Sequence, residues 1–329
     1  MTIDHPLSTP GDGHLPPAAG PRTTHPLRTI FMGTPEIAVP ALRALAARTR
    51  VLTVVTQPDR PAGRGNLLQA PAVKTAALEL GLRVWQPATV KGAETAPELQ
   101  GADLFVVMAY GELLRQPVLD LPPGGCINLH GSLLPRWRGA SPLQAAVRAG
   151  DLESGITVMR MVRALDAGPV YREERLALGA RPTLPWLHDA MAELAASALD
   201  RFLAAWPPPP PTAQDDAAAS VCRKLTAEDG RLDFTATMLD LDRWIRAYTP
   251  APGCWAAPDG AADVRLRVLA AEPCPDAVLA PGAVLAAAGR LLVGCADGAL
   301  EISRLQSPGK RALDAGEWLH GNRPPQRLG

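Results

Sequence analysis

Short apolar runs recur along the first part of this chain at intervals that suit buried strands. Residues 103–109 are almost wholly apolar, and residues 51–56 form a β-branched run. Continuous apolar runs of this length, bounded by Gly, Pro or polar residues, are typical of strands buried on both faces of a parallel sheet. The sequence therefore predicts strands at residues 27–32, 51–56, 82–85, 103–109, 126–130, 156–162 and 169–178.

Helical patterns separate most of these runs. After the glycine that closes the first strand, Thr34 can cap a helix with Pro35 at its first position, and Pro40 is expected to kink this helix or shorten its first turns. Other helices are predicted at residues 72–80, 142–149 and 184–206. This alternation predicts a Rossmann-like α/β fold with a doubly wound, mostly parallel sheet. Only one glycine stands where a dinucleotide fingerprint needs three, which excludes NAD or FAD binding at the first turn.

The chain divides at a run of consecutive prolines that opens a polar stretch, residues 207–220. This stretch predicts a semi-rigid linker between a domain at residues 27–206 and a second domain at residues 221–329. In the second domain a helix at 237–247 precedes short strand-like runs separated by Gly and Asp-Gly turns, which predicts a smaller, OB-like β-barrel. Residues 1–26 are rich in Pro, Gly, Thr and His and are expected to be disordered.

Composition narrows the class of protein. The 329 residues are 47% hydrophobic, enough for a core in each of two domains. Lys+Arg and Asp+Glu are equal at 33 each, so any contact with nucleic acid must be local. The five cysteines are odd in number and include no C-x-x-C pair, which favours reduced thiols in the cytoplasm. The chain lacks an apolar run long enough to span a membrane, and we expect it to be a monomer.

Candidate chemistry lies at the carboxyl edge of the predicted sheet. Asn128 and His130 occupy alternate positions of one short strand, so their side chains emerge on the same face. Asp166 lies in a Gly-containing loop that can approach this edge, where open α/β sheets build their sites. These three groups supply an oxyanion donor, a titratable group and an acid or base. Because no nucleophilic Ser or Cys elbow and no metal-binding cluster is recognisable, the set suits direct transfer of a carbonyl-bearing group to an amine.

Three segments resemble those of the folate-dependent formyltransferases. Residues 128–139, NLHGSLLPRWRG, look like the signature of that family, and residues 165–169, LDAGP, resemble its second motif. The loop at 57–65, QPDRPAGRG, is similar to the loop that distinguishes the members acting on methionyl-tRNA. The match extends from about residue 27 to the C-terminus and includes RKL at 223–225 and LQSPGKR at 305–311.

The resemblance implies a function and a set of site residues. Asn128, His130 and Asp166 would be the catalytic trio, transferring the formyl group of 10-formyltetrahydrofolate to the amino group of methionyl-initiator tRNA without a metal ion. The folate co-substrate is expected beside Tyr110, Gly111, Ser132, Leu133, Leu134 and Pro135. The tRNA is expected to contact the second domain and four basic residues, Arg60, Arg64, Lys310 and Arg311.

Two other functions stay open on the sequence. A formyltransferase acting on a small amine, such as glycinamide ribonucleotide or an amino sugar nucleotide, would share the Asn-x-His signature but would not need the loop at 57–65 or a second barrel. A non-catalytic RNA-binding protein on the same scaffold would not need Asn128, His130 and Asp166 together. The 57–65 loop could also be an ordinary solvated turn held by its prolines.

Overall fold

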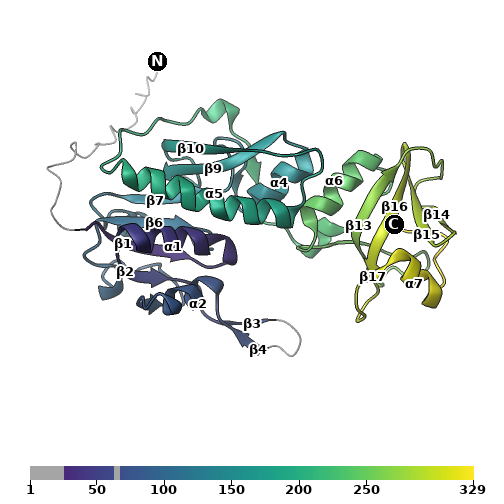
Figure 1. Ribbon diagram of the computed structural model, residues 1–329, viewed down its shortest axis with the longest axis horizontal. Coiled ribbons are helices and arrows are strands. Elements are labelled where there is room, and N and C mark those ends of the chain that lie inside the picture. Colours follow the sequence, from purple (N-terminus) through teal and green to yellow (C-terminus); the bar gives the residue numbers. More distant parts are fainter. Residues whose placement is uncertain (1–25, 63–66) are drawn as a thin grey trace, which may run out of the picture.

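The structure is a computed structural model that describes residues 26–62 and 67–329. The N-terminal extension, residues 1–26, is predicted to be disordered and lies outside these ranges except for residue 26. Arg64 also lies outside them. Two bodies are visible, a larger one with a central sheet and a smaller C-terminal one (Figure 1). None of the helices in the described ranges combines the length and apolarity that crossing a bilayer requires.

A seven-stranded sheet forms the centre of the first domain, with strand order β10-β9-β7-β6-β1-β2-β5. The strands are β1 (Arg28–Gly33), β2 (Arg50–Val55), β5 (Val84–Trp85), β6 (Leu104–Met108), β7 (Cys126–His130), β9 (Glu153–Arg160) and β10 (Val170–Ala177). The five neighbouring strands β5, β2, β1, β6 and β7 are parallel to one another. Strand β9 runs antiparallel to both of its neighbours, β7 and β10. The predicted mostly parallel sheet is therefore confirmed.

The two faces of this sheet are covered unequally. One face packs against four helices, namely α1 (Val39–Arg48), α2 (Ala72–Glu79), α4 (Pro142–Ala149) and α5 (Leu184–Ala204) (Figure 1). The opposite face packs against loops and two short helices, η2 (Pro97–Leu99) and α3 (Gln116–Leu119). Short segments leave more room than long helices do, and the candidate site lies on this second face.

The helix after β1 begins later than the sequence predicts. A 3₁₀ turn, η1 (Glu36–Ala38), precedes α1, and the Thr34 hydroxyl donates to the carbonyl of Tyr110 at 2.9 Å instead of capping the helix. Pro40 stands in the first turn of α1, where its missing N–H removes no helical hydrogen bond. Its expected effect of shortening the helix is confirmed.

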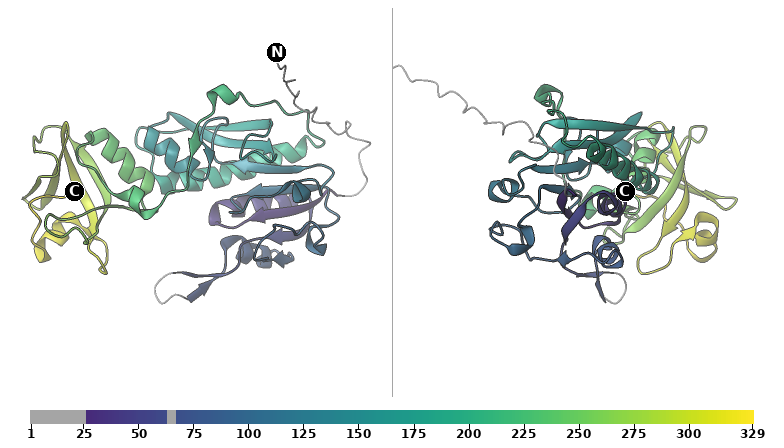
Figure 2. Two further views of the ribbon diagram at one scale, coloured as in Figure 1. Left: turned by 180° about the vertical axis from the view of Figure 1, so that it is seen from behind. Right: turned by 60° about the vertical axis from the view of Figure 1, so that its left-hand side comes forward.

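The loop that follows β2 contains a small hairpin. Strands β3 (Arg60–Ala62) and β4 (Leu67–Gln69) pair antiparallel, and the hairpin projects from the body of the first domain (Figure 2). All three residues of β4 are exposed, so no buried face exists to produce an alternating sequence pattern. For this reason the sequence indicates only a polar loop here.

The second domain is built on an antiparallel sheet in the order β12-β13-β16-β15-β14, with β17 also paired to β16. Its elements are β12 (Cys254–Ala256), β13 (Leu266–Cys274), β14 (Val284–Ala287), β15 (Arg290–Cys295), β16 (Gly298–Gln306), β17 (Leu313–Asp314), η4 (Ala227–Gly230), α6 (Met238–Tyr248) and α7 (Ala315–Gly321). The sequence predicts four of the strands and α6, before which the Thr237 hydroxyl accepts from the Asp240 N–H as an N-cap. It misses the short β12, β17 and α7.

The chain between the domains lies against the first domain. Residues 212–222, here called the interdomain segment, contain η3 (Asp216–Ala218) and β11 (Val221–Cys222). β11 pairs in parallel with β8 (Arg138–Gly139), and Thr212 exchanges both backbone hydrogen bonds with Val170. The composition alone suggests a spacer, but this stretch is hydrogen-bonded along the edge of the candidate site.

Candidate active site

Strand β7 aims Asn128 and His130 at the sheet face that lacks long helices. Ile127 and Leu129 pack into the core beneath the four helices. Because successive side chains of a strand point to opposite faces, Asn128 and His130 point to the other face of the sheet. Asn128 pairs with Val107 in β6 and with Met159 in β9, near the middle of the sheet. Asn128 is partly exposed and His130 is only 6% exposed.

His130 lies between a carbonyl group and a carboxylate. Its Nε2 is 3.0 Å from the carbonyl oxygen of Trp137, and its Nδ1 is 3.7 Å from Oδ2 of Asp166. A carbonyl oxygen only accepts hydrogen bonds, so this contact assigns a proton to Nε2. Nδ1 faces the carboxylate at a distance too long for a direct hydrogen bond. Its hydrogen-bonding capacity therefore remains open toward the site.

The Asp166 carboxylate is held by backbone geometry. Its Oδ2 accepts a hydrogen bond from the Gly139 N–H at 2.9 Å. The residue adopts φ +50°, a left-handed conformation that non-glycine residues seldom occupy. Two residues later, a Cβ on Gly168 would lie 1.8 Å from the carbonyl oxygen of Arg160, so only glycine fits there. The turn after β9 is thus shaped to present one carboxylate to His130.

The 132–135 turn, which follows β7, is held by hydrogen bonds to the side chain of Thr157. The Thr157 side chain is fully buried, accepts from the Leu134 N–H at 3.1 Å and donates to the Ser132 carbonyl at 2.7 Å. The Ser132 hydroxyl is itself buried and donates to the carbonyl of Arg136 at 2.6 Å. Leu134 is buried too, while Leu133 and Pro135 are partly exposed. The side chains available to a ligand at this turn are therefore those of Leu133 and Pro135.

A cleft of about 810 Å³ opens beside Asp166 on the same side of the sheet. Gly111, Met159 and Met161 line it together with Asp166. Its lining includes three cationic side chains, Lys91, Arg115 and Arg163. The structure thus brings Gly111 and Asp166 into one cleft, with apolar and cationic groups in its walls.

Tyr110 contributes to the site differently from Gly111. Its ring is buried in the core beneath the short helices, where burial raises the pKa of the hydroxyl and leaves that group without a hydrogen-bond partner. Only the backbone of Tyr110, whose carbonyl accepts from Thr34, lies at the end of β6. A ligand at this edge would contact that backbone and not the ring.

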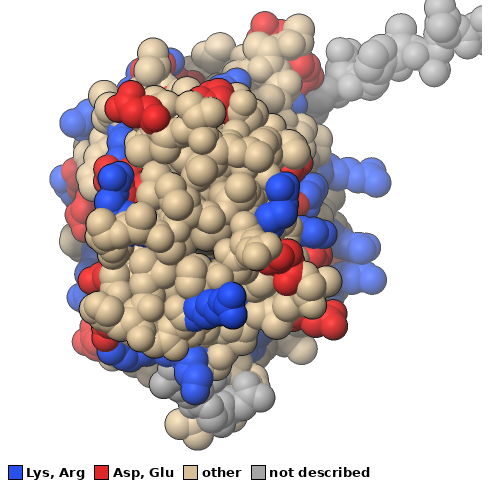
Figure 3. Space-filling view, turned by 90° about the vertical axis from the view of Figure 1, so that its right-hand side faces the viewer, with Lys and Arg blue, Asp and Glu red and all other residues tan. Residues whose placement is uncertain are grey.

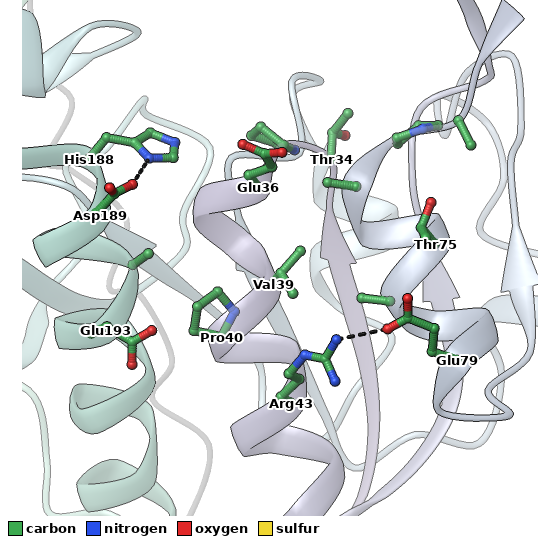
Figure 4. Close-up of a pocket in the computed structure, with 16 residues that line it drawn as sticks. Thr34, Glu36, Val39, Pro40, Arg43, Thr75, Glu79, His188, Asp189 and Glu193 are labelled. Atoms are coloured by element: carbon green, nitrogen blue, oxygen red, sulfur yellow. Dashed lines mark hydrogen bonds and ion pairs between the residues drawn. The ribbon is translucent and has the colours of Figure 1, made fainter. Parts of the chain in front are cut away.

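A second cleft, of about 970 Å³, lies between α1, α2 and the start of α5 (Figure 4). Most of its labelled charged groups pair with one another, Arg43 with Glu79 and His188 with Asp189. The residues predicted from the sequence to bind folate or tRNA do not line it. In the part of the chain that the structure describes, no group of three or more His, Cys, Asp or Glu side chains is placed to hold a metal ion.

The basic residues expected to contact tRNA belong to different domains. Arg60 is exposed on the hairpin, and its Nη2 donates to Oε1 of Gln57 at 3.0 Å. Lys310 and Arg311 are exposed after β16, and Arg311 pairs with Glu317. Arg64, outside the described residues, has no structural description.

Sequence reasoning misses three residues of the interdomain segment that contact the loops around the candidate residues Asn128, His130 and Asp166. Gln214, Ser220 and Cys222 all bond to the loops that carry Asp166 or follow His130. Their partners are between 46 and 85 residues away in the chain. No local pattern in the sequence signals contacts over such separations.

Comparison with known proteins defines the class. A family model for formyl transferase matches residues 28–203, and a model for the formyl transferase C-terminal domain matches residues 224–323. Together the two models match most of the chain, and the fold is thus that of a formyl transferase. Curated relatives narrow this further.

A methionyl-tRNA formyltransferase from Thiobacillus denitrificans is 45% identical over 302 residues, which cover 90% of this chain and 96% of the relative. One from Paracoccus denitrificans is 41% identical over 304 residues, covering 92% of this chain and 100% of the relative. The chain belongs to the methionyl-tRNA formyltransferase family. The resemblance inferred from the sequence is confirmed.

Solved structures share the fold at low sequence identity. An N-formyltransferase from Helicobacter canadensis, in complex with folinic acid and dTDP-3-aminofucose, has a TM-score of 0.65 at 13% identity and covers 85% of this chain and 100% of its own. HypX from Aquifex aeolicus, in complex with tetrahydrofolic acid, has a TM-score of 0.59 at 16% identity, covering 90% of this chain and 47% of its own.

Proposed function

We propose that this protein transfers the formyl group of 10-formyltetrahydrofolate to the α-amino group of methionyl-initiator tRNA, the modification that marks this tRNA for translation initiation. Membership of the family supports the reaction. The assignment of the site rests on one observation: His130 lies between the Trp137 carbonyl and the Asp166 carboxylate, on the sheet face that lacks long helices. We assign the catalytic roles to Asn128, His130 and Asp166.

The reaction forms one bond and breaks another. The neutral amine attacks the formyl carbon, a new C–N bond forms, and the bond from that carbon to N10 of the folate breaks. As the amine attacks, negative charge develops on the formyl oxygen. The Asn128 carboxamide and the Nδ1–H of a protonated His130 stabilise this charge, since a preorganised donor is worth most where charge appears. Asp166 balances the imidazolium, takes a proton from the attacking amine and releases a proton to N10 of the departing folate, so that the carboxylate is ionised again at the end.

The cleft beside Asp166 fits a folate co-substrate. Its methionines and the backbone of Gly111 suit a flat heterocycle that needs an apolar slot with backbone hydrogen bonds. Its three cationic side chains suit the carboxylates at the other end of a folate. When bound, the folate supplies the formyl group. We extend the contact surface to the Tyr110 backbone and to the turn formed by Ser132, Leu133, Leu134 and Pro135.

We assign the tRNA to the hairpin and to the second domain. Arg60 lies on the projecting hairpin (Figure 2), and Arg presents a planar fork to phosphates and stacks on unpaired bases. We assign Arg64, a few residues later in the sequence, to the same contact. On the end of the second domain charged side chains are sparse, and Lys and Arg stand mainly toward the margins (Figure 3). The backbone of a tRNA would therefore be contacted at such margins and not across the whole end face. We also assign Lys310 and Arg311, which are exposed after β16, to the tRNA contact.

We further propose that the second domain closes into an OB-like barrel. The last residues of the chain connect the two edges of the antiparallel sheet: Gly329 and Ala257 exchange backbone hydrogen bonds at 3.0 Å, and the Leu328 N–H donates to Gly282 at 2.9 Å. Ala257 follows β12 and Gly282 precedes β14. The protein would act as a monomer, and its five free cysteines suit the reducing cytoplasm.

The test is formyl transfer measured with a choice of acceptors. The purified protein is incubated with 10-formyltetrahydrofolate and charged initiator tRNA, glycinamide ribonucleotide or an amino sugar nucleotide. We expect formyl-methionyl-tRNA alone to accumulate. His130→Ala and Asp166→Ala should each lower turnover by about 10²–10⁴-fold, the usual share of a positioned acid or base, with tRNA binding retained. Preference for a small amine would overturn the substrate assignment, and near-normal turnover in either variant would overturn the site.

A further inference from the structure

Gln214 uses its whole hydrogen-bonding capacity at the turn that carries Asp166. Its Nε2 donates to the carbonyl oxygen of Asp166 at 2.8 Å and to that of Gly168 at 2.7 Å. Its Oε1 accepts from Nε and Nη2 of Arg138 at 3.0 and 2.8 Å. A carboxamide has two N–H donors and two acceptor lone pairs, so each has a partner. The amide orientation is fixed, because exchanging its O and N atoms would set donors against the Arg138 guanidinium.

The turn held by Gln214 needs an external constraint. Asp166 is in the left-handed region, which other backbone conformations outcompete unless the surroundings impose it. Gln214 holds the carbonyl groups at both ends of the 166–168 turn, and the Gly139 N–H holds the carboxylate of Asp166. Rotation of this peptide unit would swing the carboxylate away from His130.

The interdomain segment also holds the other partner of His130. The Ser220 hydroxyl accepts from the Trp137 N–H at 2.9 Å. The buried Cys222 thiol lies 3.5 Å from the Trp137 carbonyl oxygen, the same oxygen that His130 contacts. Trp137 likewise has a positive φ of +59°. The segment thus contacts the residues on both sides of the imidazole.

We propose that Gln214 is a positioning residue for catalysis, which sets the orientation of the Asp166 carboxylate toward His130 through the backbone of the 166–168 turn. This inference rests on the proposed formyl transfer. Gln214 does not line the cleft beside Asp166, and it acts through the turn. Its loss should therefore change the rate of the chemical step more than the binding of either substrate, because displacements of about 1 Å in a reacting group cost up to about 10²-fold in rate.

The variants differ in what they remove from the turn. Gln214→Glu keeps the size and the contact with Arg138 but sets a carboxylate against two carbonyl oxygens. Gln214→Met removes donors and acceptors and keeps the length. Asp215→Ala is the matched control, since Asp215 is exposed, caps the Ala217 N–H within the same segment and has no hydrogen bond to the turn.

We expect Gln214→Glu and Gln214→Met to lower kcat at least about tenfold, with the KM values for folate and methionyl-tRNA within about twofold of the wild type. Asp215→Ala should retain the wild-type kcat. In an Asp166→Ala background, Gln214→Met should cause no further loss, because the carboxylate that it positions is gone. Full additivity of the two losses, or a wild-type kcat in both Gln214 variants, would overturn the proposal.

A second measurement separates this inference from the assigned reaction. The ring signals of His130, observed by NMR in protein with labelled histidine and assigned with His130→Ala, should shift in Gln214→Met and stay unchanged in Asp215→Ala. If wild-type protein fails to formylate methionyl-tRNA, the assigned reaction fails while this shift still tests the positioning. If Gln214→Glu does not fold, the test uses Gln214→Met alone. Unchanged His130 signals in Gln214→Met would then refute the positioning role of Gln214.

Discussion

Replacing Thr157 by Val isolates the contribution of one buried hydroxyl to the turn beside the catalytic trio. Thr and Val have nearly the same shape, so Thr157→Val opens no cavity. It removes the partner of two backbone groups, the Leu134 N–H and the Ser132 carbonyl, at a site with no solvent exposure. A buried polar group without a partner costs about 1–3 kcal/mol, so the two groups together predict a loss of roughly 2–6 kcal/mol in the free energy of unfolding.

Thr157→Ser is the matched control. It keeps the hydroxyl and removes one buried methyl group, which costs about 1 kcal/mol. Urea unfolding of the wild type and both variants, followed by far-UV circular dichroism and by tryptophan fluorescence, would give the change in the free energy of unfolding for each variant. If two transitions appear, each domain is fitted separately. Because the turn is freed only in the Val variant, the KM for folate should rise there and not in the Ser variant. A Val variant as stable as wild type, or a Ser variant less stable than Val, would refute the reasoning.

Two further predictions concern the domain contact and the thiols. Asp242 is 2% exposed and accepts from Arg181 of the first domain at 2.7 Å and from Arg246 of its own helix at 2.9 Å. Asp242→Ala should therefore lower the free energy of unfolding by about 3–5 kcal/mol. Arg181 is half-exposed, so Arg181→Ala should lower the free energy of unfolding by at most about 1 kcal/mol. Urea unfolding in which Arg181→Ala is less stable than Asp242→Ala would contradict this. Burial raises the pKa of Cys254 to about 12 and that of Cys295 to about 11. Because a thiol in the unfolded chain ionises near about 8.5, their stabilising contribution is full below that pH and is lost as the pH rises toward the folded values. The free energy of unfolding should thus fall above about pH 8.5, and Cys254→Ala should reduce the slope; an unchanged slope would count against the burial argument.

The parts of the fold that the sequence predicts are those fixed by local periodicity. The apolar runs place β2, β6 and β7 to within a residue or two because strands in the middle of a parallel sheet are covered on both faces and are mostly apolar. The end of α4 is predicted at Gly150, which adopts φ +72° as a helix-terminating glycine does. The shared face of Asn128 and His130 follows from the two-residue period of a strand.

The rest depends on contacts that no local pattern encodes. Strand β4 of the hairpin is exposed along its length, and the start of α1 is displaced because Thr34 bonds to a residue 76 positions away. Asp166 is predictable as a candidate, but its orientation is set by Gly139 in the two-residue strand β8 and by Gln214 in the interdomain segment, both far from it in the sequence. Tyr110 shows the converse case, since an aromatic residue at the carboxyl end of a strand is placed in the core and not toward the ligand.

The path of the interdomain segment bears on how this enzyme can be divided. A fragment that stops at the end of α5 would contain Asn128, His130 and Asp166, yet it would lack Gln214, Ser220 and Cys222, which hold the loops around them. A fragment that keeps these contacts must therefore extend at least to residue 222. Exchange of C-terminal domains between relatives would have to be made beyond that point, so that each recipient keeps the stretch that matches its own active-site loops.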